Sequence, residues 1–256
     1  MTTIAILQAR MSSTRMPGKV LAPLAGEPML VRQLERILRA STLDGVVVAT
    51  SLDPSDDPIV EALAHAAPLI GEIPVVRGSL SDVLARFVTA MDAYPSDAVV
   101  RLTADCPLAS PAVIDRVVSA FRAGDVDYVS NTMSPAYPDG LDVEVVRADV
   151  LREVAEIAID RHEREHVTLG VYRRHDRYRV ANVAGDRDLS GLRWTVDTPE
   201  DYAFVADIYC DLYPANPDFE LDDVLAWLER HPGRSRTVAD AKRNAALDGL
   251  DTGAMQ

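Results

Sequence analysis

The chain contains little cysteine, few aromatic residues and no long apolar run. Its two cysteines, Cys106 and Cys210, cannot build the disulfide framework of a small secreted domain. No apolar stretch approaches the roughly 20 residues that span a membrane, and the first residues show no signal-peptide pattern. We therefore expect a cytoplasmic protein without a membrane partner.

An excess of positive charge is also missing, because the formal net charge of the 256 residues is −14. This argues against nucleic acid as a partner, since binding to a phosphate backbone requires a basic surface. A small phosphorylated ligand remains compatible with the composition, because it needs only a local cationic pocket. Nearly half of the residues are hydrophobic, which is enough for a sizeable core.

Lysine is almost absent and occurs only at positions 19 and 242. Lys19 ends a loop that follows a predicted strand at residues 4–7 and contains hydroxyl residues, two arginines and a Pro-Gly turn. Backbone N–H groups in such a loop bind anions, and its cations neutralise them. The alternative is a solvated surface loop, and the spacing is not that of a P-loop. The residues expected to bind phosphate are Arg10, Ser12, Ser13, Thr14, Arg15 and Lys19.

Apolar runs alternate with helical patterns over the first half of the chain. Because continuous apolar strands separated by helices are typical of parallel sheets, we expect an α/β fold with helices on both faces. The predicted strands are residues 4–7, 45–50, 73–76 and 98–102, and the predicted helices are 29–40, 54–67, 81–94 and 111–121.

The second half is less regular. We expect strands at 127–130, 143–147 and 178–183, a helix at 164–175, a strand ending at 196, and helices from 198, at 221–230 and at 238–247. The predicted division is an α/β domain over 1–214, a helical extension over 215–248 and a disordered tail over 249–256.

Charged residues follow several predicted strands. Arg77 comes after the third strand, Asp105 after the fourth and Asp197 after the strand ending at 196. In open α/β sheets, ligands bind beyond the carboxyl ends of the strands. Mg²⁺ binds through one or two carboxylates together with phosphate oxygens, so Asp105 and Asp197 are candidate metal ligands. Asp197 has an alternative role, which is to help cap the helix that starts at Thr198.

Six stretches of the sequence carry a family resemblance. They are QARMSSTRMPGKVL at 8–21, RGS at 77–79, RLTADCPL at 101–108, YPDGLDVE at 137–144, REHVT at 164–168 and RWTVDTPED at 193–201. Together they resemble the cytidylyltransferases, which include CMP-KDO synthetase, CMP-sialate synthetase and the spore-coat polysaccharide biosynthesis protein F group. The motif sequences are most similar to those of the last group. The resemblance extends to about Tyr213.

The resemblance implies a fold and a reaction. The fold is a single-domain three-layer α/β/α sandwich with a mostly parallel mixed sheet, as in nucleotide-diphospho-sugar transferases (GT-A-like). The reaction transfers CMP from CTP to an acceptor and releases pyrophosphate, with Mg²⁺ on Asp105 and Asp197. Arg10, Lys19 and Asp105 are then catalytic, and relatives form homodimers through the second half of the domain. The family reads the cytosine edge with a residue at a position like that of Arg77, which is alternatively a surface arginine paired with Asp82. The backbone of Leu7 and Ala9, where the chain is extended, is also expected to contact the base, and Thr103 is expected nearby.

The acceptor site is expected around residues 137–144 and His166. Carboxylates in a pocket suit hydroxyl, amino or sugar groups, although an edge strand with a polar face is the alternative. His166 is a candidate general base or a structural histidine. The acceptor is a sugar-type, phosphorylated or phosphonate compound. The residues assigned to it are Tyr137, Asp139, Asp142, Glu144 and His166.

Three other functions remain open at the level of sequence. One is a nucleotidyltransferase that uses UTP or GTP, although the loop motif usual in those enzymes, Leu/Gly-x-Gly-x-Gly-Thr-Arg-Leu, is missing. Another is a glycosyltransferase, for which Asp125-Val126-Asp127 nominally supplies the Asp-x-Asp metal motif. The third is a catalytically silent nucleotide-binding partner of a biosynthetic complex.

Overall fold

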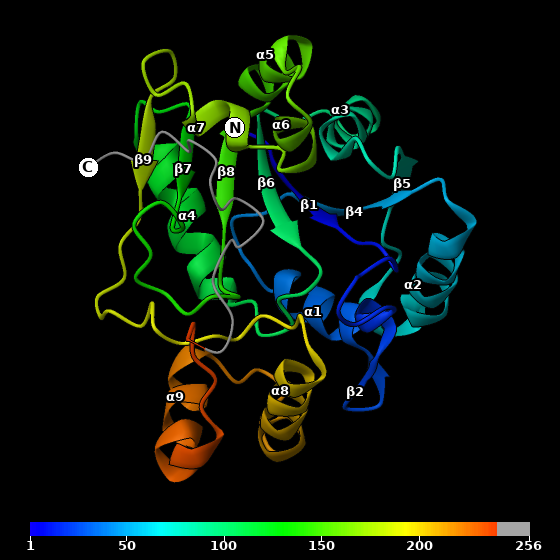
Figure 1. Cartoon of the computed structure of the whole chain (residues 1–256), viewed down its shortest axis with the longest axis vertical. Helices are drawn as coiled ribbons and strands as arrows, with labels where there is room; N and C mark the ends of the chain where they lie inside the picture. The colour runs from blue at the N-terminus through cyan, green and yellow to red at the C-terminus, as the bar shows by residue number, and fades with distance from the viewer. Residues whose placement is uncertain (240–256) are drawn as a thin grey trace.

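A seven-stranded mixed sheet crosses the middle of the molecule in the computed structural model, which describes residues 1–239 (Figure 1). The strand order is β5-β4-β1-β6-β8-β7-β9, and β8 is antiparallel to both of its neighbours while the other neighbouring pairs are parallel. The predicted mostly parallel mixed sheet is therefore confirmed. The strands are β1 (Thr3–Gln8), β4 (Gly45–Ser51), β5 (Val75–Gly78), β6 (Ala98–Thr103), β7 (Tyr128–Ser130), β8 (Glu144–Arg147) and β9 (Val180–Asn182), with a hairpin of β2 (Pro23–Leu24) and β3 (Glu27–Pro28).

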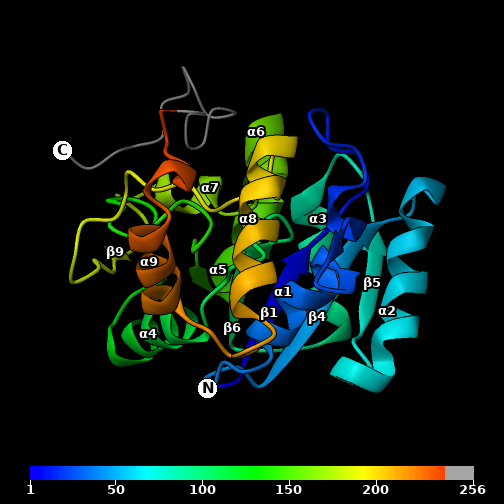
Figure 2. The same cartoon turned by 90° about the horizontal axis from the view of Figure 1, so that it is seen from below.

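Helices cover both faces of this sheet. One face carries α1 (Met29–Ile37), α2 (Asp57–Ile70), α4 (Pro111–Ala123), α8 (Pro199–Leu212) and α9 (Leu221–Arg230), which lie toward the viewer in Figure 2. The other face carries α3 (Val83–Ala93), α5 (Ala148–Ile157), α6 (Arg161–Glu165) and α7 (Leu169–Tyr172). The described part of the chain also contains the short 3₁₀ turns η1 (Lys19–Leu21), η2 (Pro54–Asp56) and η3 (Pro232–Arg234).

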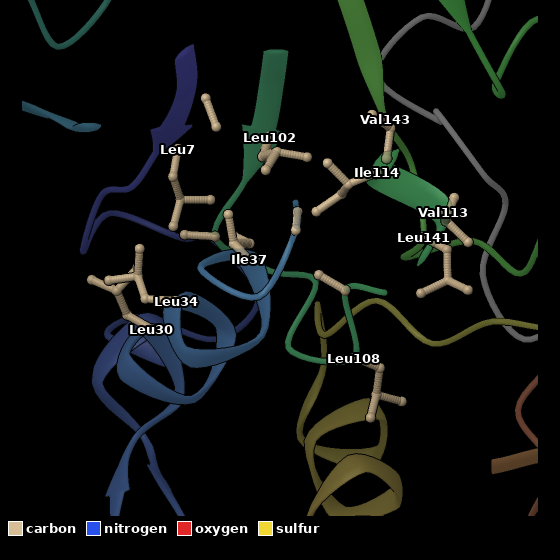
Figure 3. Packing of buried hydrophobic residues seen from close by; sticks show 14 of the residues in the cluster. Leu7, Leu30, Leu34, Ile37, Leu102, Leu108, Val113, Ile114, Leu141 and Val143 are labelled. Atoms are coloured by element: carbon tan, nitrogen blue, oxygen red, sulfur yellow. The ribbon is translucent and has the colours of Figure 1, made fainter. Parts of the chain in front are cut away.

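The apolar central strands supply side chains to a core on each face, because successive strand residues point to opposite sides. Leu7 of β1 and Leu102 of β6 face Leu34 and Ile37 of α1 (Figure 3). Ile6 belongs to the cluster on the opposite face. No helix within residues 1–239 is both long and apolar enough to cross a membrane.

The C-terminal part of the described chain packs on the first of these cores. The Trp227 ring of α9 meets the Phe204 ring of α8 edge-on, with 6.2 Å between their centroids. The predicted helix at 238–247 and the predicted tail at 249–256 lie outside the described residues, apart from Val238 and Ala239. The proposed domain boundaries stay a prediction.

In the second half, two element predictions were wrong and one helix was missed. Helix α5 was not predicted, and the single helix expected at 164–175 is two short helices, α6 and α7. Val167 between them has a φ of +48°, which is unfavourable for a β-branched residue and breaks the helix. Around Val196 there is no strand, because the segment bonds to loop backbone and forms only an isolated bridge from Arg193 to Asp139.

Candidate functional site

A cleft of about 220 Å³ opens at the carboxyl ends of β1 and β6. This is the edge at which open α/β sheets bind ligands. The loop after β1 forms one wall, and Thr103, Ala104 and Asp105 form another. The lining residues are Gln8, Ala9, Arg10, Ser13, Thr14, Arg15, Lys19, Val20, Thr103, Ala104, Asp105 and Asp197.

Lys19 joins the two walls of the cleft. Gly18, with a φ of +75°, turns the chain into η1 and directs the Lys19 side chain inward. The Lys19 Nζ atom lies 3.2 Å from Asp105 Oδ2 and 2.9 Å from Asp197 Oδ1. It also donates a 2.6 Å hydrogen bond to the Val196 carbonyl oxygen. The three residues singled out from the sequence therefore meet at one point.

The charges of this cluster stabilise one another. Burial alone would lower the pKa of Lys19, but Asp105 and Asp197 raise it above its ordinary value. Burial alone would raise the pKa of Asp105, but Lys19 and hydrogen bonds from Thr103 and Cys106 hold it below its ordinary value. Both groups are therefore charged at neutral pH.

A buried carboxylate, Asp56, binds the start of the loop after β1. Asp56 accepts hydrogen bonds from the Met11 N–H at 2.7 Å and from the backbone and side chain of Ser51. This contact fixes the start of the loop on the end of β4. Ser13, Thr14 and Arg15 then line the cleft, whereas Ser12 does not. The Arg15 guanidinium pairs with Asp197 at 3.0 Å.

Arg193 is a site residue that the sequence analysis did not single out. Its side chain is 1% exposed and contacts Asp139 at 2.9 Å, Asp197 at 2.7 Å and Asp201 at 3.3 Å. Asp201 also accepts the backbone N–H groups of Asp197 and Thr198, so it caps α8. Arg193 therefore holds Asp197 against the first turn of that helix.

The segment before α8 reaches the cleft through backbone contacts. The Trp194 N–H bonds to the Asp139 carbonyl oxygen at 2.6 Å, and the Val196 N–H bonds to the Asp105 carbonyl oxygen at 2.8 Å. Gly140 has a φ of +113°, and a Cβ atom there would lie 2.6 Å from the Thr195 nitrogen. Only glycine fits this close approach, which sets Asp197 beside Asp105.

Asp105 and Asp197 fit the ligand set of a magnesium ion that is shared with a nucleotide. Both carboxylates converge on one cationic nitrogen, so the position between them favours positive charge. Within residues 1–239 no group of three or more metal-binding side chains occurs. An ion here would need further oxygen ligands, which is the usual arrangement of Mg²⁺ with phosphate groups and water.

A second pocket of about 120 Å³ adjoins the cleft. It shares the wall formed by Gln8, Ala9 and Arg10 and extends toward α3 and α6. Burial and the nearby Arg101 lower the pKa of His166, so this imidazole is neutral at pH 7. The lining residues are Gln8, Ala9, Arg10, Val83, Arg86, Arg101, Glu165 and His166.

Known proteins resemble this chain over most of its length. Residues 4–229 match the family described as Cytidylyltransferase. The chain belongs to the cytidylyltransferase family. It is 34% identical to the spore coat polysaccharide biosynthesis protein SpsF of Bacillus subtilis, over 89% of this chain and 94% of that protein. It is 32% identical to an uncharacterised protein of Methanocaldococcus jannaschii, over 91% and 92%.

A solved cytidylyltransferase structure has the same fold. The enzyme from Leptospira borgpetersenii superposes with a TM-score of 0.85 at 28% identity, over 91% of this chain and 96% of that one. The chain is therefore a nucleotidyltransferase by family and by fold.

Two of the carboxylates expected at the acceptor, Asp139 and Glu144, are paired with arginines. Glu144 pairs with Arg101 and accepts hydrogen bonds from Tyr128 and Thr168, each at 2.6 Å. Asp139 pairs with Arg193. These bonds occupy both carboxylates, and neither residue lines the two pockets. Contact of Asp139 and Glu144 with the acceptor stays a prediction.

The remaining predicted residues lie in the hydrophobic core or near Asp105. Tyr137 is 5% exposed and belongs to the hydrophobic core, as does the Leu7 side chain. Asp142 acts together with burial and Asp105 to raise the pKa of the Cys106 thiol, so it lies near the residue after Asp105.

Arg77 lies away from both pockets. Its guanidinium donates to the carbonyl oxygens of Ser51 and Asp53 and pairs with Asp57 at 2.7 Å. The expected alternative partner, Asp82, pairs instead with Arg164 at 2.6 Å. Contact between Arg77 and the cytosine stays a prediction.

The nominal Asp-x-Asp motif lies at the end of the strands opposite to the cleft. Asp127 precedes β7, which runs parallel to β6, so it lies opposite the end that carries Asp105. Its carboxylate pairs with Arg147 at 3.4 Å and Arg179 at 3.1 Å, and Asp125 pairs with Arg179 as well. The arrangement does not support the glycosyltransferase alternative.

Proposed function

We propose that the protein transfers CMP from CTP to an acceptor in a Mg²⁺-dependent reaction that releases pyrophosphate. The observation that carries this proposal is the convergence of Lys19, Asp105 and Asp197 in one cleft next to Arg10 and Arg15. Two carboxylates and three cations at the end of a parallel sheet suit a triphosphate with its metal ion.

The chain's own residues have separate roles in this proposal. Asp105 and Asp197 hold Mg²⁺, which when bound neutralises phosphate charge and polarises the α-phosphorus. An acceptor oxygen attacks that phosphorus, and the bond to the β-phosphate oxygen breaks. Arg10, Arg15 and Lys19 balance the charge that grows on the departing pyrophosphate. Lys19, which contacts both aspartates, would contact the phosphates of bound CTP when Asp105 and Asp197 hold the metal ion.

The second pocket is the proposed position of the acceptor. It opens on the same wall of the cleft, so an acceptor there lies beside the phosphates of CTP. The neutral His166 imidazole has a lone pair that accepts a hydrogen bond from the attacking hydroxyl group. Asp142 stays a proposed acceptor contact. The name of the Bacillus relative, a spore coat polysaccharide biosynthesis protein, supports a role in the synthesis of polysaccharide precursors.

The experiment is a pyrophosphate-release assay with CTP, UTP, GTP and ATP. Each nucleotide is offered with Mg²⁺ and a panel of sugar, sugar-phosphate and phosphonate acceptors. We expect release with CTP and with one class of acceptor, and its loss in Asp105→Asn. Release with another nucleotide at a higher rate, or none in any combination, would contradict the proposal.

A further inference from the structure

Arg86 of α3 is a buried cation for which no direct ion pair with a carboxylate is found among residues 1–239. The residue is 1% exposed and lines the second pocket. Its Nε atom donates no hydrogen bond among the described residues, and the buried carboxylate of Asp56 acts on its charge without forming an ion pair. Its Nη1 atom donates a hydrogen bond to the Ser79 carbonyl oxygen at 3.2 Å. Burying an unpaired charge is unfavourable by several kcal/mol, so such a group is expected to have a ligand.

The fold places this side chain by two local features. Asp82 caps α3 by accepting the Ala85 N–H at 2.9 Å, which fixes the first turn of the helix. Gly78 at the end of β5 leaves room for the Arg86 stem, because a Cβ atom there would lie 3.1 Å from Arg86 Cγ. The guanidinium is therefore held in position before any ligand binds.

The second pocket carries an excess of positive charge. Arg10, Arg86 and Arg101 line it, but the charge of Arg101 is balanced by Glu144. Glu165 is the carboxylate among the lining residues, and it is exposed to solvent at the edge. Burial and Arg10 lower the pKa of Arg86 to about 10 although Asp56 opposes the shift, which still leaves Arg86 charged at neutral pH. The buried end of the pocket thus presents a guanidinium that only the more distant Asp56 offsets and that has a free Nε donor among the described residues.

We propose that Arg86 binds an anionic group of the acceptor, a carboxylate, phosphate or phosphonate, at the buried end of the second pocket. The proposal rests on the proposed function, because it assumes that CTP occupies the neighbouring cleft. The guanidinium has the planar donor pair that matches such anions in a bidentate manner. A neutral cytosine ring would leave the charge of Arg86 unbalanced, so the nucleotide base is the less suitable occupant.

The test measures KM for CTP and for the acceptor in Arg86→Gln and Arg86→Lys. We expect Arg86→Gln to raise the acceptor KM by about 10- to 100-fold, as for a lost charged hydrogen bond, with KM for CTP within about twofold of wild type. Arg86→Lys should recover part of the loss. The control Arg152→Gln, at an exposed arginine of α5 that pairs with Asp92, should change neither constant.

A binding measurement keeps the test independent of turnover. Methylphosphonate is titrated calorimetrically into protein saturated with CMP and pyrophosphate, which occupy the cleft. We expect wild-type protein to bind this probe and Arg86→Gln to bind it at least about 10-fold more weakly. Equal binding by both proteins, or a rise in KM for CTP alone, would overturn the role of Arg86. An inactive wild-type enzyme that still binds the probe through Arg86 would overturn the proposed reaction and not the anion site.

Discussion

Lys19 connects the loop after β1 to the two aspartates on the opposite wall of the cleft. Its side chain is 9% exposed, and its ammonium group contacts Asp105 and Asp197 directly. If it also stabilises charge on the leaving pyrophosphate, its removal affects the transition state more than the fold. We expect Lys19→Ala to lower turnover by about 100- to 1000-fold, measured as pyrophosphate release under saturating CTP.

A matched control separates this effect from a general loss of positive charge. Arg116→Gln removes an exposed arginine that pairs with Asp186 on the surface of α4, and such pairs contribute about 0–1 kcal/mol. Thermal melts of Arg116→Gln and of Lys19→Ala should show that both variants are folded. A Lys19→Ala enzyme with near-normal turnover would remove Lys19 from the mechanism.

His166 gives a prediction about pH. Burial, Arg101 and His162 lower the pKa of His166, while Glu165 and Glu144 partly oppose the shift. NMR titration should therefore place its midpoint below the ordinary value of about 6.5. Between the lowered pKa of His166 in the folded protein and its ordinary pKa in the unfolded chain, only the unfolded chain binds a proton on this imidazole. The free energy of unfolding therefore falls as the pH falls below about 6.5. His166→Gln should weaken this dependence, and a midpoint at or above 6.5 would contradict it.

The residues of the cleft were largely predictable, because their type or position was unusual. Lys19 was conspicuous in a chain that uses arginine almost everywhere else, and Asp105 follows a clear strand. Arg193 and Arg86 had no such signal. Each is one arginine among many, and its role depends on burial and on which carboxylates lie nearby, which the sequence does not display.

At the scale of elements, the strands of the parallel half followed from their continuous apolar runs, and α4 and α8 followed from their N-caps. Helix α5 gave no start signal, because it begins directly after β8 at Arg147 without a side-chain cap. The segment at 193–196 is extended, as the sequence suggested, but its hydrogen bonds go to distant loops. Only the tertiary structure determines such partners.

Gly140 allows an element-scale test of how Asp197 is positioned. Gly140→Ala places a methyl group against the backbone of Trp194 and Thr195 at a φ of +113°. We expect a loss of at least about 3 kcal/mol of folding free energy, which lowers the melting temperature by roughly 6–12 °C. Calorimetry is the measurement.

The control for that substitution is Gly191→Ala, since nothing lies within 4 Å of a Cβ atom at Gly191. A change below about 0.5 kcal/mol is expected there. Equal stability of the two variants would mean that the 140–195 contact does not position the segment before α8.

At the scale of the whole molecule, a protein of net charge −14 presents a cleft lined by Arg10, Arg15 and Lys19. Overall charge therefore says little about this ligand, because the local cluster dominates at short range. CTP with Mg²⁺ at 100 times its Kd should stabilise the fold by about 2.7 kcal/mol. Thermal melts should show a larger shift with CTP than with ATP, GTP or UTP, and equal shifts would argue against a cytidine-specific site.

The most direct measurement is a crystal structure of the protein with CTP and Mn²⁺, in which anomalous scattering locates the metal. We predict Mn²⁺ on the carboxylates of Asp105 and Asp197, with the Lys19 ammonium moved from these aspartates to the phosphates. A metal ion bound elsewhere, or a triphosphate outside the cleft with Lys19 still between the aspartates, would contradict the account.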